Sequence, residues 1–310
     1  TFKELLLGMD ALNTISVWEK IYKMQLSSHG MGYASTMALS GIDIALWDIK
    51  GKFFNTPIYR LLGGGKNKIK AYAGGIALGW QDPISLGEEA LSHVSKGYKA
   101  VKLRVGDKIK NDMDRVTQVR KVLQDDIEIL VDANTNYTIN DAQKTIPFYE
   151  DQQITWLEEP FPAMEFNNYR TAKTFGNLSL AAGENHFTRF EFSRLVEDNV
   201  INYAQPDVSK AGGITEVIRI EKRIINIIQK ELEAEKNNCQ IIWIKSKIIT
   251  SNYKIFGELK FREKKTRNID SINDCLRKIG EILQNKFRVF VRLRAFSIKD
   301  ASIAALDLEN

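Results

Sequence analysis

The sequence predicts an α/β protein built on a (β/α)₈-type barrel, preceded by a mainly helical segment. Short apolar segments with strand character alternate six times with helical stretches, as they do in parallel α/β sheets. Three of these segments end in an acid, and Asp132, Glu158 and Glu184 follow one another at the same interval of 26 residues. One strand, one helix and two loops take about that length. An open, doubly wound sheet is the alternative, but no GxGxxG follows the first strand.

Residues 1–66 are predicted to form a separate, mainly helical domain. Met37–Trp47 (MALSGIDIALW) has apolar side chains at helical spacing, and the glycines of LLGGG supply a stop. Residues 67–310 are then predicted to form the barrel domain. Its first six strands are expected at Ile69–Gly74, Ala100–Arg104, Ile129–Asp132, Trp156–Glu158, Leu180–Ala182 and Asn202–Gln205.

Residues 221–310 have a different character from the rest of the predicted barrel. Ile214–Lys236 reads as a long amphipathic helix, and Cys239–Lys245 and Phe287–Leu293 are candidates for the seventh and eighth strands. The length suffices to close a barrel, but the turn and site signals of the earlier units are absent. An incomplete barrel, or a frameshifted or chimeric end, is therefore the alternative.

The bulk properties exclude some classes of protein. The sequence has no run of 18 apolar residues, so no membrane span is expected. Two cysteines, Cys239 and Cys275, do not make a disulfide scaffold, so a reduced, cytoplasmic setting is expected. The net charge of +5 comes from residues 221–310, and solvated surface charge explains it better than nucleic-acid binding does.

The three equally spaced acids predict a metal site. Acids at the carboxyl ends of three successive parallel strands are expected to point into one pocket. Three carboxylates so close repel one another unless a cation lies between them. Oxygen ligands with room left for water suit Mg²⁺, which predicts a magnesium site at Asp132, Glu158 and Glu184. Glu159 faces the other way and is expected to pair with a cation.

Further polar residues follow the predicted strands. Lys102 and Arg104 are two apart on one strand and therefore face the same side, across from the acids. Asn134 lies two residues after Asp132, and Asp207 follows the sixth strand. A metal, a cation pair and a further acid suit removal of a proton next to a carboxylate, with Mg²⁺ stabilising the enediolate.

The segments ALSGIDIALWDIKGK, PIYRLLGG, VKLRVG, VDAN, WLEEP, AAGEN and QPDVSKAGGITE resemble, in order, signatures of the mandelate racemase / muconate lactonizing enzyme family of the enolase superfamily. The resemblance covers about residues 2–220. It implies a (β/α)₇β barrel with a capping domain, Mg²⁺ on the three acids, and frequently a symmetric homo-oligomer. It also implies that Lys102 contacts the substrate carboxylate or tunes its neighbour, and that Asn134 touches the substrate or a metal-bound oxygen. Residue 104 is implied to be the base, and Asp207 to orient a catalytic histidine.

Three departures bear on the activity. The chain starts within the capping helices and without an initiator Met, so part of the substrate lid is expected to be missing. Arg104 stands where the family usually has a lysine base, and an arginine stays protonated, which favours an electrostatic clamp. Lys245, Ser246 or Lys247 falls where the partner histidine belongs, because His29, His93 and His186 all precede Asp207.

These residues predict a Mg²⁺-dependent lyase, and a dehydratase of a sugar acid (an aldonate or aldarate) in particular. Dehydration needs only one side of the substrate, whereas a racemase or epimerase of a 2-hydroxy acid needs a base on both faces. That racemase is the alternative enzyme. A catalytically impaired fragment without the Asp–His pair is the other alternative.

Overall fold

The computed structural model describes residues 2–64, 71–74, 78–123, 125–239, 241–249, 254–261, 292–293 and 304–307. The chain divides into two compact units. The first unit comprises Thr1–Ile58 and Lys70–Val217, and the second comprises Tyr59–Ile69 and Ile218–Asn310.

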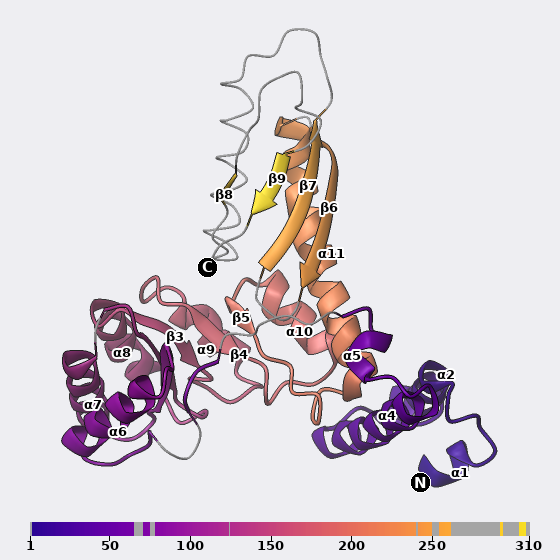
Figure 1. Cartoon of the computed structure of the whole chain (residues 1–310), viewed down its shortest axis with the longest axis horizontal. Helices are drawn as coiled ribbons and strands as arrows, with labels where there is room; N and C mark the ends of the chain where they lie inside the picture. Colours follow the sequence, from indigo (N-terminus) through magenta and orange to yellow (C-terminus); the bar gives the residue numbers. More distant parts are fainter. Residues whose placement is uncertain are drawn as a thin grey trace, which may run out of the picture. The chain divides into compact units, whose positions relative to one another are not determined.

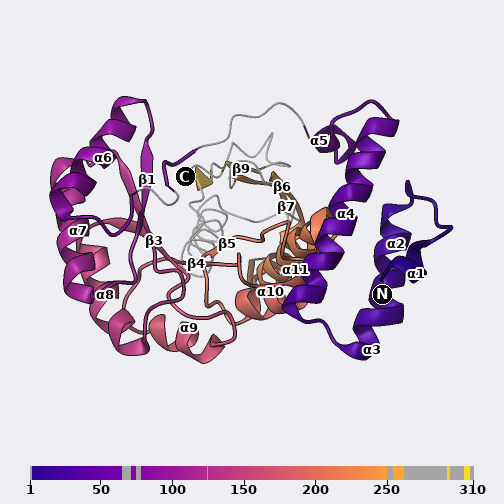
Figure 2. The ribbon, with the colours of Figure 1, turned by 90° about the horizontal axis from the view of Figure 1, so that it is seen from below.

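A parallel sheet forms the centre of the first unit (Figure 1). Its described strands, in order across the sheet, are β1 (Ala100–Arg104), β2 (Glu128–Asp132), β3 (Ile154–Glu158), β4 (Leu180–Ala182) and β5 (Tyr203–Ala204). The helices α6 (Pro83–Ser95), α7 (Ile109–Val122), α8 (Ile139–Asp151), α9 (Phe166–Ala172) and α10 (Thr188–Glu197) alternate with them along the chain. Figure 2 shows α6 to α9 following one another along the outer side of the sheet.

These five strands confirm the predicted positions to within two residues. The first predicted strand, Ile69–Gly74, lies partly outside the described residues. Within its described part, Ala73 forms a parallel bridge to Val101, and the Lys102 amide donates to the Ala73 carbonyl at 2.7 Å. This segment therefore adds a parallel partner beside β1.

Local signals account for the helix starts. Asp82 accepts hydrogen bonds from the amides of Ile84 and Ser85, and Pro83 occupies the first turn of α6. Thr138 and Asp141 bond reciprocally as a capping box at the start of α8. Both helices thus begin where the sequence supplies partners for otherwise unsatisfied amide groups.

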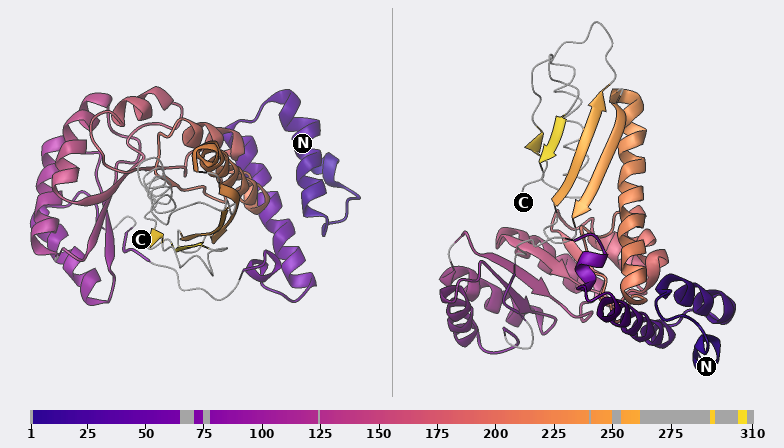
Figure 3. Two further views of the ribbon diagram at one scale, coloured as in Figure 1. Left: turned by 90° about the horizontal axis from the view of Figure 1, so that it is seen from above. Right: turned by 45° about the vertical axis from the view of Figure 1, so that its right-hand side comes forward.

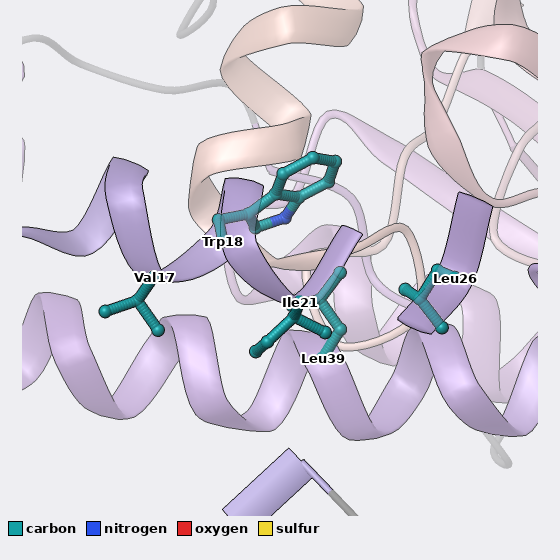
Figure 4. Close-up of a cluster of buried hydrophobic side chains, with 5 residues drawn as sticks. All are labelled: Val17, Trp18, Ile21, Leu26 and Leu39. Carbon is teal, nitrogen blue, oxygen red and sulfur yellow. The ribbon is translucent and has the colours of Figure 1, made fainter. Parts of the chain in front are cut away.

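The N-terminal segment is helical, as predicted. Its elements are α1 (Phe2–Leu6), α2 (Thr14–Ile21), the π-helix η1 (Tyr22–Leu26), α3 (Ser27–His29), α4 (Tyr33–Phe53) and α5 (Ile58–Leu61). Helices α2 and α4 are joined by a buried apolar cluster of Val17, Trp18, Ile21, Leu26 and Leu39, drawn in Figure 4. Burying such side chains contributes about 2 kcal/mol each.

Helix α4 also contacts the start of α11 (Gly213–Cys239) through buried polar groups. Asp43 Oδ2 accepts from the Thr215 amide at 2.9 Å, and the Trp47 indole donates to Thr215 Oγ1 at 3.0 Å. Gly213 has φ +88°, and an added Cβ there would lie 2.4 Å from Asp43 Oδ2. The motifs ALSGIDIALW and KAGGITE therefore meet in one interface within the first unit.

The strands after residue 220 differ from the prediction, because they form a separate antiparallel sheet in the second unit. Its described strands are β6 (Ile241–Ile249), β7 (Lys254–Phe261), β8 (Arg292–Leu293) and β9 (Ala304–Asp307). They pair antiparallel in the order β6-β7-β9-β8, and Figure 3 shows β6 and β7 as a long pair.

The seventh predicted strand, Cys239–Lys245, is therefore wrong as a barrel strand. Cys239 ends α11, and β6 pairs with β7 across four residues, a hairpin length that no parallel crossover allows. Of the eighth predicted strand, residues 287–291 lie outside the described residues, and Arg292–Leu293 pair antiparallel with β9. The parallel sheet, as far as the structure describes it, ends at β5.

None of the described helices has the length and apolar character that a membrane span requires.

Candidate metal centre

The strand register brings three charged residues side by side. Arg104 pairs with Asp132 between β1 and β2, and Asp132 pairs with Glu158 between β2 and β3. Each lies at the carboxyl end of its strand, where parallel α/β folds build their sites.

Lys102 lies between the two carboxylates. Its Nζ is 3.1 Å from Asp132 Oδ2 and 2.9 Å from Glu158 Oε1, and the side chain is 13% exposed. Burial disfavours the charged ammonium, but the Glu158 and Asp132 carboxylates outweigh burial and hold the pKa of Lys102 above its ordinary value. The Lys102 ammonium also lies 5.5 Å from the centre of the Tyr72 ring.

Two further groups fix the carboxylates. The Trp156 indole donates to Glu158 Oε2 at 3.2 Å, so this largely buried tryptophan also has a polar role. The backbone amide of Asn134 donates to Asp132 Oδ1 at 3.0 Å, in a turn where Asn134 has φ +45°. Sequence reasoning missed Tyr72 and the indole contact, because neither follows from spacing along the chain.

Arg104 is more accessible than Lys102. Its Nη1 lies 4.0 Å from Asp132 Oδ2, and its side chain is 35% exposed. A guanidinium in this position has room to contact a bound anion while it stays near the carboxylate pair.

Glu184 lies in the loop after β4 and is half-buried. The preceding Gly183 has φ +149° and packs against Gln205, where an added Cβ would lie 2.7 Å from backbone atoms. Throughout the described ranges, no three or more histidine, cysteine, aspartate and glutamate side chains lie close enough together to hold a metal ion. The structure thus brings Asp132 and Glu158 together around Lys102, and does not gather Glu184 with them.

Glu159 is buried, and its carboxylate contacts Asn185 rather than the cation that the sequence predicted. Its Oε1 and Oε2 accept from the backbone and side-chain amides of Asn185 at 3.2 and 2.6 Å. Burial raises the pKa of Glu159 to about 7, and the nearby Glu184 charge acts in the same direction.

Asp207 lies in the loop after β5 and is half-buried. Its Oδ1 accepts from the amide and hydroxyl of Ser209, both at 2.7 Å. Residues 245–247, where the resemblance places a histidine, belong to β6 of the second unit.

His186 is part of the aromatic core rather than of the candidate site. Its ring makes edge contacts with Phe166, Tyr169 and Phe192. Burial lowers the pKa of His186 to about 4, so the ring is neutral near pH 7.

The donor chemistry of the strand ends fits a divalent cation. Asp132 and Glu158 are each 3% exposed. Each has a carboxylate oxygen close to the same positive charge, the Lys102 ammonium. Hard oxygen donors of this kind suit Mg²⁺.

Comparison with known proteins shows the family to which the chain belongs. Residues 85–224 match the model of the enolase C-terminal domain-like family, and residues 2–63 match the mandelate racemase / muconate lactonizing enzyme N-terminal domain. Over these residues the chain belongs to the mandelate racemase / muconate lactonizing enzyme family of the enolase superfamily. The predicted family is thereby confirmed.

Several characterised relatives are similar in sequence. The chain is 35% identical to an arabinonate dehydratase of Saccharolobus solfataricus, over 70% of this chain and 59% of the relative. It is also 35% identical to a 3,6-anhydro-alpha-L-galactonate cycloisomerase of Streptomyces coelicolor, over 68% of this chain and 58% of the relative. The chain therefore spans less than three fifths of the length of these relatives.

Solved structures support the fold. An enolase-superfamily member from Polaromonas sp. JS666 is 49% identical with a TM-score of 0.71, over 74% of this chain and 61% of that one. A racemase from Streptomyces coelicolor with bound magnesium is 30% identical with a TM-score of 0.67, over 73% of this chain and 63% of that one.

Proposed function

We propose that the protein is a Mg²⁺-dependent lyase that removes the α-proton of a sugar-acid carboxylate, and a dehydratase of an aldonate or aldarate in particular. The observation that carries this proposal is the buried group of Lys102, Asp132 and Glu158 at the carboxyl ends of neighbouring parallel strands. The similarity to an arabinonate dehydratase supports the substrate class.

The proposed ligands of the metal are Asp132, Glu158 and Glu184. When bound, Mg²⁺ draws electron density from the substrate carboxylate and so acidifies the adjacent carbon. Asp132 and Glu158 are held by strand register, whereas Glu184 depends on the loop after β4.

The cations bind and orient the substrate. Lys102, whose pKa is held above its ordinary value, stays protonated and attracts the substrate carboxylate to the side where the acids lie. Arg104 is more exposed, and we propose it as a bidentate clamp on substrate oxygens rather than as the base. Asn134 is proposed to contact the substrate. Asp207, whose carboxylate lies half-buried in the loop after β5, is proposed to accept the α-proton and to return it to the hydroxyl that leaves as water.

A racemase or epimerase of a 2-hydroxy acid is the second candidate. Inversion of a carbon centre needs proton-transferring groups on both faces of the substrate. Lys102 and Arg104 on β1 are proposed to orient the substrate, and Asp207 alone is proposed to transfer a proton, so only one face is supplied and dehydration is favoured. A chain that binds Mg²⁺ without turnover would correspond to the catalytically impaired alternative.

The test is a screen of arabinonate, galactonate and related acids with the purified full chain and Mg²⁺. Dehydration is expected to yield a 2-keto-3-deoxy acid, detected by its reaction with semicarbazide. Lys102→Met is expected to lower kcat/KM at least about 100-fold, since it removes an oriented charge at the reacting carboxylate. Recovered substrate with inverted configuration and solvent deuterium at the α-carbon would establish the racemase instead.

A further inference from the structure

Glu159 joins segments that follow three different strands. It comes directly after Glu158 and is 1% exposed. Its backbone amide donates to Ala181 of β4 at 2.9 Å, and its carbonyl accepts from Thr135, after β2, at 2.7 Å. The backbone of Glu159 has φ +36°, a conformation that residues other than glycine rarely adopt and that the surrounding contacts must hold.

The carboxylate of Glu159 holds the loop that carries Glu184. One oxygen accepts from the Asn185 backbone amide at 3.2 Å, and the other accepts from the Asn185 side-chain amide at 2.6 Å. Glu184 is therefore covalently adjacent to a residue that is fixed at two points. An isolated loop glutamate would lose more side-chain and backbone freedom when it bound a cation.

Asn185 is fixed from the other side as well. Its Oδ1 accepts from Lys210 Nζ at 3.2 Å, and Lys210 follows Asp207 in the loop after β5. The contacts from Glu159 through Asn185 to Lys210 thus tie the loop after β4 to the end of β3 and to the loop after β5.

Burial of the Glu159 carboxylate costs more free energy than a purely structural role would require. A buried carboxylate disfavours folding unless its hydrogen bonds offset the loss of water, and a neutral side chain would fill the same space more cheaply. The strand-end neighbour Glu158 faces Lys102, whereas Glu159 faces the Glu184 loop. The adjacent acids Glu158 and Glu159 therefore contact two different parts of the candidate metal centre, Lys102 and the loop that carries Glu184.

We propose that Glu159 is a positioning residue, which holds the backbone of Gly183–Asn185 in place so that Glu184 needs little further ordering to reach a cation bound by Asp132 and Glu158. This inference rests on the proposed Mg²⁺ site. It assigns to Glu159 a role in metal affinity without direct contact with the metal.

The test compares Glu159→Gln with Glu191→Gln in the full chain. A glutamine at position 159 keeps the shape but replaces one accepting oxygen by a donor, so one of the two Asn185 hydrogen bonds is lost. Glu191 is a matched control, because its carboxylate accepts from the Phe187 amide at 2.7 Å at the far end of the same loop. Calorimetric titration with MgCl₂ and melting curves in EDTA are measured for each protein.

Glu159→Gln is expected to weaken Mg²⁺ binding about 10- to 100-fold, the size of effect seen when the partner of a metal ligand is removed. Its melting temperature in EDTA is expected to equal or exceed that of the wild type, because a buried charge is removed. If Glu159 had a purely structural role, Glu159→Gln would lower both the Mg²⁺ affinity and the melting temperature in EDTA. Glu191→Gln is expected to bind Mg²⁺ as the wild type does.

Asn185→Ala provides an independent variant, since it removes the other side of the contact. It is expected to weaken Mg²⁺ binding as Glu159→Gln does, and the double variant is expected to show little further loss. Wild-type affinity in either single variant overturns the positioning role while leaving the metal site in place. A wild type without saturable Mg²⁺ binding overturns the proposed function itself, and the positioning role with it.

Discussion

The two halves of the candidate metal centre are built in different ways. The strand cluster (Lys102, Arg104, Asp132 and Glu158) lies on β1 to β3, and the register of the sheet alone brings its members together. The loop cluster (Glu184, Asn185 and Asp207) lies after β4 and β5, and other side chains hold its loops. Strand spacing therefore assembles one half of the site, whereas the other half depends on buried side chains that hold its loops.

The largest expected effect concerns Lys102 in the strand cluster. Lys102→Met leaves Asp132 and Glu158 buried beside each other without their shared cation. We expect a loss of about 3–5 kcal/mol in the free energy of unfolding without metal, as when one partner of a buried ion pair is removed. We also expect Mg²⁺ to stabilise this variant more than the wild type, because the metal replaces the missing charge.

Arg104→Met is the control for Lys102→Met, measured by urea unfolding with and without Mg²⁺. Arg104 is more exposed and farther from Asp132, so its loss is expected to cost less than about 1 kcal/mol. Equal costs for the two variants would show that Lys102 is not the cation that compensates the strand cluster.

The next effect concerns His186, which anchors the loop after β4 in the aromatic core. Its folded-state pKa is about 4, below the ordinary value of 6.5. The folded state therefore binds fewer protons than the unfolded state between pH 6.5 and pH 4, and stability falls as the pH falls through that window.

His186→Phe removes this linkage. On acidification from pH 6.5 to pH 4, the variant is expected to gain up to about 3 kcal/mol of stability relative to the wild type. Urea unfolding across this pH range gives the difference directly. Parallel stability curves for the two proteins would mean that His186 is not buried as a neutral ring.

A smaller effect is expected at Gly183, where the loop after β4 meets β5. Gly183→Ala adds a Cβ about 2.7 Å from the Gln205 backbone at φ +149°, so the loop must shift. We expect a loss of about 2 kcal/mol together with weaker Mg²⁺ binding. Gly97→Ala is the control, because Gly97 has φ +96° with nothing within 4 Å, so it loses stability but keeps the wild-type Mg²⁺ affinity.

The sequence predicted the strand cluster well for a physical reason. Strands β1 to β5 end in recognisable apolar runs, and parallel neighbours in register place their last residues side by side. The sequence could not predict the anchors of the loop cluster. Glu159 and Asn185 are 26 residues apart, and their contact depends on where the loop after β4 turns.

The region after residue 217 shows a different limit. The apolar run CQIIWIK has strand character, which was predicted, but strand character does not reveal a strand's partner. The following run, Lys254–Phe261, lies a hairpin length away and pairs with β6 antiparallel. The short interval along the sequence between two strand-like runs is a signal that favours a hairpin over a barrel strand.

The most direct test of the account is thermal unfolding of the full chain in Mg²⁺ and in EDTA, with Asp132→Asn alongside the wild type. We predict that Mg²⁺ raises the wild-type midpoint, because a ligand bound only by the folded state contributes about 2.7 kcal/mol at 100 times its Kd. Asp132→Asn is predicted to lose that rise while still unfolding cooperatively. An equal Mg²⁺-dependent rise in Asp132→Asn, or none in the wild type, would contradict the proposed metal centre.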